Sequence, residues 1–336
     1  MRYAVLHGRR SGHRSDAGLV AHVGNVLVAG GHQVELLTAE DVAAAHSACA
    51  TAVVDGVDVL LVIGGDGAVR IAASHCVGSE TAIAIVPAGS GNDTVRSLAI
   101  PTGTADAIQV ARRGHRWRID VIHASSTAAN DMSSTSDTST TSTTSSIKAW
   151  QDYVVGSVPA ALDARIAARS QRVPSLLGPA KYAAAALVEI PQLRPQPYRL
   201  HLDGPGSQGA NGTQREARDL EVEALVVAVC NLPIFGGGMQ IAPDANPSDG
   251  LLDVVMIEKV GPGAALGLLR GVFTGTHADH PAVRIERCSR IDIAGPELTA
   301  YGDGDPLGPL PLTCEVRPGA LDVIVPAGNG KGPDVA

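Results

Sequence analysis

The sequence predicts an α/β domain with a parallel sheet, followed by a second domain made mostly of β-strands. Its 336 residues suit two domains of about 150 residues each. Segments 58–63 and 81–86 are apolar after their first residues, Asp58 and Thr81, and each runs into a glycine-rich turn. Strands that are apolar on both faces are typical of a parallel sheet covered by helices. Beyond residue 198, short apolar runs alternate with Gly, Pro and Asp, which indicates antiparallel strands.

The first domain alternates strands and helices, and we place it at residues 1–122. Apolar runs predict strands, and the segments with helical spacing or many alanines predict helices. In order along the chain, these are strand 3–7, helix 17–29, strand 33–37, helix 41–52, strand 58–63, a further helix and strand 81–86. The C-terminal tail, 322–336, is expected to pack back on this domain.

A tract rich in Ser and Thr follows, at residues 125–146, where 16 of 22 positions carry a hydroxyl side chain. Such a composition cannot bury enough apolar surface to offset the entropy of ordering, so we expect a disordered surface insertion. A phosphorylated or glycosylated regulatory segment is the alternative.

The second domain, residues 123–321, includes this tract and then becomes mostly β. Helical spacing predicts two helices, at 162–168 and 180–188. The predicted strands are 220–229, 250–257, 290–294 and 321–325.

The composition excludes several classes of protein. A net charge of -8 and only 3% aromatic residues argue against a nucleic-acid binder. The five cysteines lie far apart without a CxxC pair, which indicates neither a disulfide framework nor a zinc site. No apolar stretch reaches the roughly 20 residues of a membrane-spanning helix. We therefore expect a cytoplasmic protein whose contact with a membrane, if any, is peripheral.

The two glycine-rich turns carry the clearest chemical signal. In open parallel sheets, ligands bind beyond the carboxyl ends of the strands. Glycines at that place let the backbone approach a phosphate closely, and the first N–H groups of the next helix donate hydrogen bonds to it. Residues 64–67 and 89–93 would follow neighbouring strands and face one cleft. Two ordinary tight turns are the alternative, which the acidic residues at both tips disfavour.

Four segments, in order, resemble the catalytic domain of the diacylglycerol kinase family. That family comprises bacterial lipid kinases related to sphingosine kinases and, more remotely, to NAD kinases. The segments are IGGDG at 63–67, VPAGSGND at 86–93, the stretch from FGGGM to DGLLD at 235–253, and DGDPLGP with PGAL at 303–321. The resemblance implies a Rossmann-like nucleotide-binding domain, an antiparallel β-sandwich domain, and ATP with Mg²⁺ in the cleft between them.

The resemblance also implies roles for single residues. The residues that it matches to the nucleotide site are Thr38, Gly64, Gly65, Asp66, Gly67, Gly89, Ser90, Gly91, Asn92 and Asp93. The residues that it matches to a Mg²⁺ site are Asn246, Asp249 and the carbonyl of Leu251. It places Asp305 as the acceptor of the hydroxyl proton, with Asp303 and Asp66 completing the catalytic carboxylates. Phosphoryl transfer needs such phosphate positioning, charge neutralisation and a carboxylate at the attacking oxygen.

The function expected from the resemblance is an ATP- and Mg²⁺-dependent kinase for diacylglycerol or a related lipid alcohol, in phospholipid biosynthesis. It would work in the cytoplasm or at the inner membrane surface, and a homodimer is left open. Ala68 stands where the family has Thr, and Val69 and Arg70 stand where it has Asn and Glu, so a hydroxyl and a carboxylate are missing. Asp305 stands where the family has Glu. These departures motivate one alternative, a nucleotide-binding regulatory protein. The GGDG loop leaves a second, a sphingoid-base or NAD kinase-like phosphotransferase, because that loop is shared with NAD kinases.

Three other features have an ordinary explanation and a functional alternative. The basic residues of 112–118 suggest a solvated helix end and loop, and the alternative is that this run or the basic residues of 165–172 contact anionic lipid. His277 and His280 suggest an exposed loop rather than a metal pair. The apolar residues 176–177 and 183–188 suggest core packing rather than an acyl-chain groove.

Overall fold

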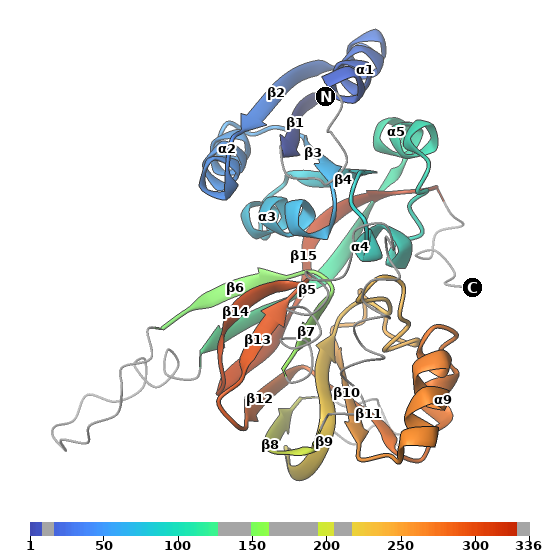
Figure 1. Ribbon diagram of the computed structural model, residues 1–336. Helices are drawn as coiled ribbons and strands as arrows, with labels where there is room; N and C mark the ends of the chain where they lie inside the picture. Colours follow the sequence, from blue (N-terminus) through green and yellow to red (C-terminus); the bar gives the residue numbers. More distant parts are fainter. Residues whose placement is uncertain (9–16, 127–148, 161–193, 205–216, 328–336) are drawn as a thin grey trace, which may run out of the picture.

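The computed structural model describes residues 1–8, 17–126, 149–160, 194–204 and 217–327. Within these ranges, the chain forms an α/β part and a mostly β part, which are joined through one 13-stranded sheet (Figure 1). The strand order along the main path of this sheet is β11-β10-β9-β8-β12-β15-β4-β3-β1-β2. The predicted helices at 162–168 and 180–188 and residues 127–146 of the Ser/Thr-rich tract lie outside the described residues.

Four parallel strands form the α/β part, which confirms the predicted fold class. These strands are β1 (Arg2–Gly8), β2 (Gln33–Ala39), β3 (Val59–Gly64) and β4 (Ala82–Pro87). β1 pairs with both β2 and β3, and β3 pairs with β4, all of them parallel. The helices that connect or follow them are α1 (Ala17–Ala29), α2 (Val42–Val54), α3 (Asp66–Cys76), α4 (Asp93–Ser97) and α5 (Thr104–Arg113).

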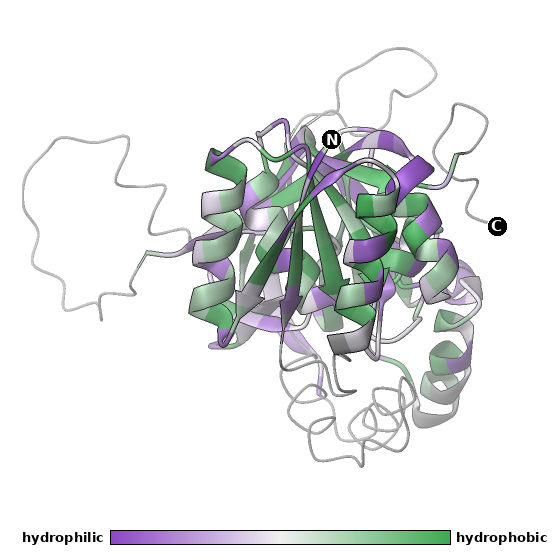
Figure 2. Ribbon diagram, turned by 90° about the horizontal axis from the view of Figure 1, so that it is seen from above, coloured by the Kyte–Doolittle hydropathy of each residue, from purple (hydrophilic) through white to green (hydrophobic). Residues whose placement is uncertain are grey.

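Helices cover both faces of this sheet, so every residue of β3 and β4 is buried. Because side chains alternate along a strand, Val59, Leu61 and Ile63 pack on one face with α1 and α5. Leu60 and Val62 pack on the other face with α2 and α3. Figure 2 shows the hydrophobic strands enclosed between helices whose outer surfaces are more polar.

The second part is an antiparallel β domain, as the sequence predicts. Its strands are β5 (His115–Ser126), β6 (Gln151–Val154), β7 (Ser157–Pro159), β8 (Gln196–Asp203), β9 (Arg218–Cys230), β10 (Leu252–Glu258), β11 (Val283–Cys288), β12 (Arg290–Ala294), β13 (Thr299–Gly302), β14 (Asp305–Pro309) and β15 (Leu312–Val325). Buried side chains from most of these strands form an apolar core. Helix α9 (Pro262–Val272) covers the outer face of β9 and β10. A short 3-10 helix, η4 (Thr276–Asp279), follows α9 in the chain.

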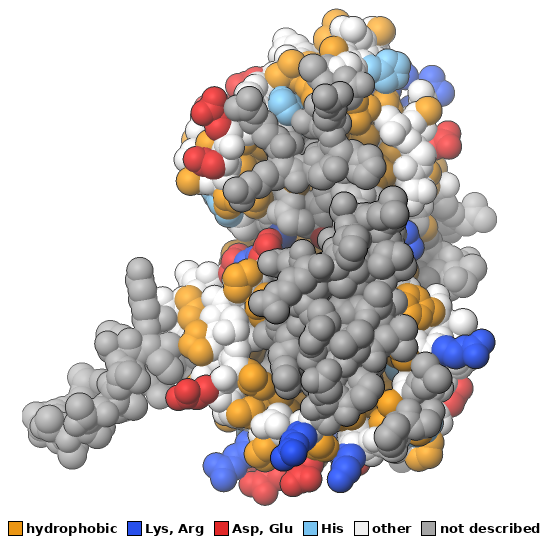
Figure 3. Space-filling view, viewed as in Figure 1, with side chains coloured by type: hydrophobic (Ala, Val, Ile, Leu, Met, Phe, Trp, Pro, Cys, Tyr) orange, Lys and Arg blue, Asp and Glu red, His pale blue; other side chains and the backbone are white. Residues whose placement is uncertain are grey.

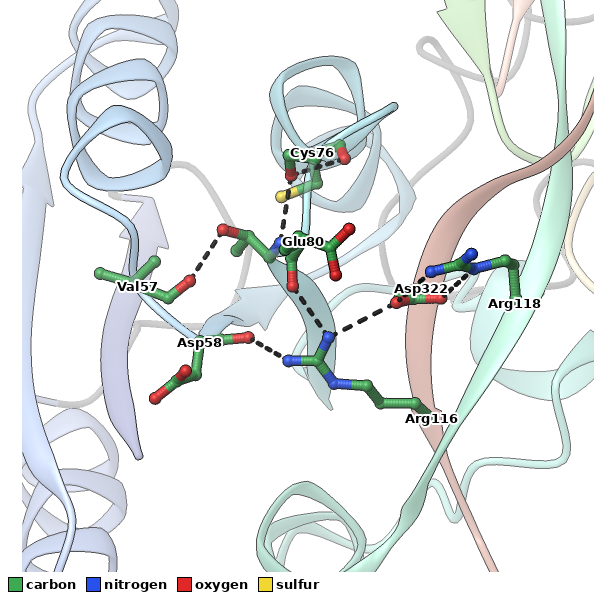
Figure 4. Close-up of polar contacts among 9 residues, drawn as sticks. Val57, Asp58, Cys76, Glu80, Arg116, Arg118 and Asp322 are labelled. Carbon is green, nitrogen blue, oxygen red and sulfur yellow. Dashed lines mark hydrogen bonds and ion pairs between the residues drawn. The ribbon is translucent and has the colours of Figure 1, made fainter.

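Strands β5 and β15 join the two parts. They pair with each other over most of their length, and Val323 of β15 also pairs with Ile83 of β4. The Arg116 guanidinium donates to the carbonyls of Asp58 and Glu80 at 3.0 and 2.8 Å, which ties β5 to the ends of the parallel strands (Figure 4). Both long strands therefore cross the predicted domain boundaries, residues 122/123 and 321/322.

The carboxylate of Asp322 completes this junction. It is buried and pairs with Arg118 at 3.0 Å and with Arg116 at 3.4 Å (Figure 4). Residues 115–118 were expected in a solvated loop, but they begin strand β5. The structure thus gives Arg116 and Arg118 ion-pair partners within the chain, because β15 returns from the far end of the sequence to lie beside them.

Two further expectations are wrong in detail. Ser125 and Ser126 were assigned to the disordered tract, yet both are buried at the end of β5. His277 was expected in an exposed loop, but it is 2% exposed and its Nε2 lies 3.0 Å from the carbonyl oxygen of Ile241. Ser125 and Ser126 lie opposite Thr313 and Leu312 of β15, and His277 contacts a loop 36 residues earlier in the sequence.

All five cysteines are buried, and none of them is part of a disulfide. Burial raises the pKa of the Cys49 thiol to about 11, so this thiol stays protonated near neutral pH. None of the helices among the described residues combines the length and hydropathy that crossing a membrane takes.

Candidate active site

The two glycine-rich loops leave the sheet side by side. Gly64, the last residue of β3, lies opposite Pro87, the last residue of β4. Both strands are parallel, so both loops emerge at the same edge of the sheet. The first loop turns directly into α3, and the second turns into the short helix α4.

Backbone touches backbone where these loops meet. A Cβ placed on Gly65 would lie 2.9 Å from the Cα of Gly89, and one placed on Gly89 would lie 2.5 Å from the Cα of Gly65. Asn92 closes the second loop, because its Oδ1 accepts from the Gly89 N–H at 3.1 Å and its Nδ2 donates to the Gly89 carbonyl at 2.9 Å. Asn92 has a φ of 55°, a conformation that Asn tolerates better than most residues. Its role here is to shape the loop.

The acidic residues of the loops, Asp66 and Asp93, face each other. Asp66 begins α3, and its Oδ1 accepts from the Thr94 N–H at 3.0 Å. Asp93 accepts from the Gly237 N–H at 2.7 Å, while its other oxygen is buried and has no hydrogen-bond partner among the described residues. Burial, and then the Asp66 carboxylate, raise the pKa of Asp93 to about 6. A carboxylate pair of this kind favours a cation between or beside it.

The hairpin of β13 and β14 brings Asp303 and Asp305 to the loops. Its turn residues Asp303 and Gly304 have φ values of 49° and 92°, as a tight two-residue hairpin requires. The Asp303 carboxylate is buried and accepts the N–H groups of residues 155, 156 and 157 at 2.9, 2.9 and 3.1 Å. Burial raises the pKa of Asp303 to about 6, although these three hydrogen bonds oppose the rise. Asp303 therefore anchors the turn.

Asp305 lies against the first loop. Its carboxylate is 58% exposed, and its Oδ2 would be 3.5 Å from a Cβ on Gly67. The same oxygen lies 3.5 Å from the Nη1 atom of Arg70, on α3. Arg70 also pairs with Asp152 of β6. The hairpin, β6 and α3 thus meet at one point, and Figure 3 shows acidic and basic side chains side by side at the waist between the two halves of the molecule.

A cleft of about 1140 Å³ lies between the loops and the hairpin. Ten of the predicted site residues line it, namely Gly64, Gly65, Asp66, Gly67, Gly89, Ser90, Gly91, Asp93, Asp303 and Asp305. Its walls are acidic: the carboxylate residues lining it are Glu40, Asp41, Asp66, Asp93, Asp152, Asp303 and Asp305. Arg70 is the one Lys or Arg among the described residues of the lining.

The remaining predicted residues do not line this cleft. Thr38 is exposed on the edge strand β2, just before the lining residues 39–41. Asn92 is outside the lining and holds its loop through its hydrogen bonds with Gly89. The three residues predicted to bind Mg²⁺ lie in the loop that precedes β10, away from the glycine loops.

That loop is closed by its own hydrogen bonds. The Asn246 Oδ1 accepts from the Ser248 N–H at 3.1 Å. The Asp249 carboxylate accepts from the Leu251 N–H at 3.0 Å and pairs with the Arg287 guanidinium. A cationic side chain therefore already neutralises Asp249, and a metal site at this loop stays a prediction.

Sequence reasoning missed three residues of the cleft. Arg70 entered only as a departure from the family pattern, although its spacing of four residues from Asp66 places both on one face of a helix. Gly237 entered only as part of the FGGGM segment of the resemblance, without a role, and Asp152 carried no local signal. Each of the two reaches the cleft through contacts with residues more than 80 positions away, Asp152 with Arg70 and Gly237 with Asp93.

The donor set of the cleft fits Mg²⁺. Asp66 and Asp93 present hard carboxylate oxygens, one of them buried without a hydrogen bond. No three His, Cys, Asp or Glu side chains gather closely enough to hold a metal ion alone, within the part of the chain that is described. Mg²⁺ prefers this arrangement, since it usually takes one or two carboxylates and completes its shell with phosphate oxygens and water.

A parallel nucleotide-type sheet, an antiparallel β domain and an acidic cleft with glycine loops between them are the features expected of a two-domain kinase. Residues 2–124 match the diacylglycerol kinase catalytic domain. Residues 156–325 match the YegS C-terminal NAD kinase beta sandwich-like domain. The chain belongs to the diacylglycerol kinase family, and this membership supports a kinase activity.

The relatives agree along most of the chain. A diacylglycerol kinase of Mycobacterium tuberculosis is 30% identical over 278 residues, which are 82% of this chain and 80% of that protein. A diacylglycerol kinase of Staphylococcus saprophyticus is 23% identical over 284 residues, 84% of this chain and 81% of its own length.

Solved structures share the fold. One structure from Bacillus anthracis has a TM-score of 0.71 at 17% identity and covers 96% of both chains. A structure of a diacylglycerol kinase from the same organism has a TM-score of 0.64, also at 17% identity and 96% coverage of both chains.

Proposed function

We propose that this protein is a lipid kinase that transfers the γ-phosphate of ATP, with Mg²⁺, to the hydroxyl of diacylglycerol or a related lipid alcohol. The observation that carries the proposal is the position of Asp305. Its exposed carboxylate lies beside Gly67, in the loop expected to hold the nucleotide phosphates. The family of the chain supplies the lipid alcohol as the class of acceptor.

The charge of the cleft supports a requirement for a divalent cation. Seven carboxylate residues and one arginine line it among the described residues, and ATP adds a polyphosphate. Carboxylates and phosphates packed this closely repel one another strongly in a partly buried site. When bound beside Asp66 and Asp93, Mg²⁺ would neutralise the phosphate charge and orient the γ-phosphate.

The residues of the chain then have distinct roles. The glycine loops let backbone N–H groups approach the phosphates, and the N-terminus of α3 adds the positive end of its dipole. Asp305 accepts the proton of the lipid hydroxyl while that oxygen bonds to the γ-phosphorus and the bond to the ADP oxygen breaks. Asp303 keeps the hairpin in place. The lipid would be reached by peripheral association with a membrane surface.

The test is transfer of labelled γ-phosphate from ATP to dispersed diacylglycerol by the full-length protein. We expect magnesium-dependent transfer, and about a 10²-fold or greater loss in Asp305→Asn, since a positioned general base contributes about 10²–10⁴-fold. Asp66→Asn should lose activity and bind ATP less tightly in the presence of Mg²⁺. Asp219→Asn is the matched control, because this side chain is 87% exposed and far from the cleft.

The acceptor panel includes a sphingoid base and NAD. Phosphorylation of NAD in preference to every lipid would show a soluble-nucleotide kinase instead. Calorimetry separates the remaining alternative, for which the departures at Ala68 and Arg70 are the motive. Tight ATP binding without transfer to any acceptor would refute the kinase proposal in favour of a nucleotide-binding regulatory protein.

A further inference from the structure

Arg70 is the one Lys or Arg among the described residues that line the cleft. It lies on α3 one turn after Asp66, and long helical side chains lean toward the N-terminus of their helix, here toward the first glycine loop. The side chain is only 11% exposed. Among the described lining residues it faces seven carboxylate residues as the single Lys or Arg, so what it contacts matters for the whole cleft.

Within the described part of the chain, every hydrogen-bond or ion-pair partner of its guanidinium belongs to the β domain. Nη1 donates to the Gly302 carbonyl at 3.3 Å and lies 3.5 Å from the Asp305 Oδ2, while Nη2 pairs with Asp152. A planar guanidinium can hold several acceptors in fixed directions, whereas a lysine ammonium is a point charge on a flexible stem. Arg70 therefore links α3, β6 and the hairpin through one rigid group.

The hairpin needs this link on the side that carries Asp305. Its turn is anchored through Asp303, whose carboxylate accepts three backbone N–H groups of residues 155–157. For the Asp305 side chain, Arg70 is the polar partner that the described part of the chain provides. Without it, the half-exposed carboxylate could rotate away from Gly67.

We infer that Arg70 is a positioning residue, which holds the Asp305 carboxylate against the Gly64–Gly67 loop while Asp152 holds the guanidinium. The inference rests on the proposed function for the role of Asp305. Asp152 matters because it gives the guanidinium a partner other than a phosphate, so that Arg70 stays beside Asp305 when the nucleotide binds. A displacement of about 1 Å at a reacting group can cost about 10²-fold in rate, which sets the scale of the expected effect.

The experiment compares Arg70→Gln, Arg70→Lys and Asp152→Asn in the full-length protein, each in an otherwise native chain and with Asp305→Asn. For Arg70→Gln we expect a loss of about 10²-fold in kcat, with the KM for ATP and the calorimetric Kd for ATP with Mg²⁺ within about threefold. Arg70→Lys should recover part of the loss because it keeps the charge. Asp152→Asn should lose about 10-fold in kcat.

The double variants distinguish positioning from an independent role. If Arg70 acts through Asp305, Arg70→Gln changes kcat by less than about threefold once Asp305 is already Asn, because residues that act as a unit are not additive. Multiplicative losses would overturn the inference. So would a large rise in the Kd for ATP with kcat retained, which would show that Arg70 contacts the nucleotide directly.

Two measurements keep the result independent of activity and of folding. Arg199→Gln is the matched control, since that side chain is 81% exposed in a surface pair, and it should leave kcat and the unfolding midpoint unchanged. Amide hydrogen exchange over residues 302–309 should quicken in Arg70→Gln, whether or not the protein transfers phosphate. Unchanged exchange there would refute the link between Arg70 and the hairpin, whereas absent transfer by the wild-type protein would refute only the proposed function.

Discussion

Asp303 offers the most direct test of how the hairpin is held. Its buried carboxylate accepts three backbone N–H groups, two at Oδ1 from residues 156 and 157 and one at Oδ2 from residue 155. Replacing it with Asn keeps one oxygen but turns an amide NH₂ toward one of the three donors. Replacing it with Ala removes every acceptor, and it also places Ala at a φ of 49°, which Asp tolerates better.

The expected losses follow from the number of donors left without a partner. A buried polar group without a hydrogen bond costs about 1–3 kcal/mol. We expect Asp303→Asn to lower the free energy of unfolding by about 2 kcal/mol at pH 7.5, from one unpaired N–H group. Asp303→Ala should lower it by about 4 kcal/mol, because three N–H groups lose their partner and some of them will reach water.

The difference between the wild-type protein and Asp303→Asn should also depend on pH. The pKa of Asp303 is raised from 3.8 to about 6 in the folded protein, so between these values the folded state binds more protons than the unfolded chain. Stability from this group therefore increases as the pH falls through 6. Asn does not titrate, so the wild-type advantage should grow by about 1 kcal/mol between pH 7.5 and pH 5.

The assay is urea unfolding at both pH values, monitored by circular dichroism, with Glu223→Gln, at an exposed position of β9, as a surface control. Taking differences between variants isolates Asp303 from the other titrating groups. Losses below about 0.5 kcal/mol for both variants would refute the hydrogen-bonding argument, because they are within the range of ordinary surface substitutions. An advantage that shrinks at pH 5 would refute the raised pKa.

Three further predictions concern the glycine loops and the charges. Gly89→Ala should lower the free energy of unfolding by about 1–3 kcal/mol and raise the KM for ATP, because the new Cβ would lie 2.5 Å from the Cα of Gly65 in the other loop. Gly24→Ala is the control and should do neither, because its Cβ would have no neighbouring atom nearer than 4.0 Å. The Mg²⁺-dependent affinity for ATP should fall as the pH drops below 6, because Asp93, whose pKa is raised to about 6, then becomes neutral. In calorimetry, Asp93→Asn should bind ATP weakly and without this pH dependence. Equal pH profiles of ATP affinity for the wild-type protein and Asp93→Asn would contradict the prediction. Arg287→Gln should lower the free energy of unfolding by about 2 kcal/mol, because Asp249 loses its counter-charge. For the same reason, the unfolding midpoint of this variant should respond to Mg²⁺. A wild-type midpoint that already responds to Mg²⁺ would argue for a metal ion at the loop that carries Asp249.

Local patterns in the sequence were sufficient to predict the strands, helices and loops whose formation depends on residues close together in the chain. The apolar runs before each glycine turn predicted β3 and β4, because a strand buried on both faces must be apolar throughout. The helix predicted at 17–29 and the strand predicted at 290–294 have the observed ends. The placement of both loops at one sheet edge also followed, since neighbouring parallel strands end together.

Contacts between distant segments were beyond such patterns. Residues 115–118 were expected in a solvated helix end and loop, because the pairing with β15 that makes them the start of β5 joins residues about 200 positions apart. His277 was misjudged for the same reason, since its partner Ile241 lies on another loop. A periodicity reports which face of an element is apolar, but it does not report what will cover that face.

By itself, the sequence determined the class of fold, the two glycine loops and the acidic residues at their tips, because these depend on turn geometry and on the apolar period of each strand. Only the tertiary structure decided which charges meet. It placed the Arg70 guanidinium between Asp152 and Asp305, and it gave Asp249 an arginine partner. The physical reason is that an ion pair forms wherever packing brings two side chains within a few ångströms, and packing depends on the whole chain.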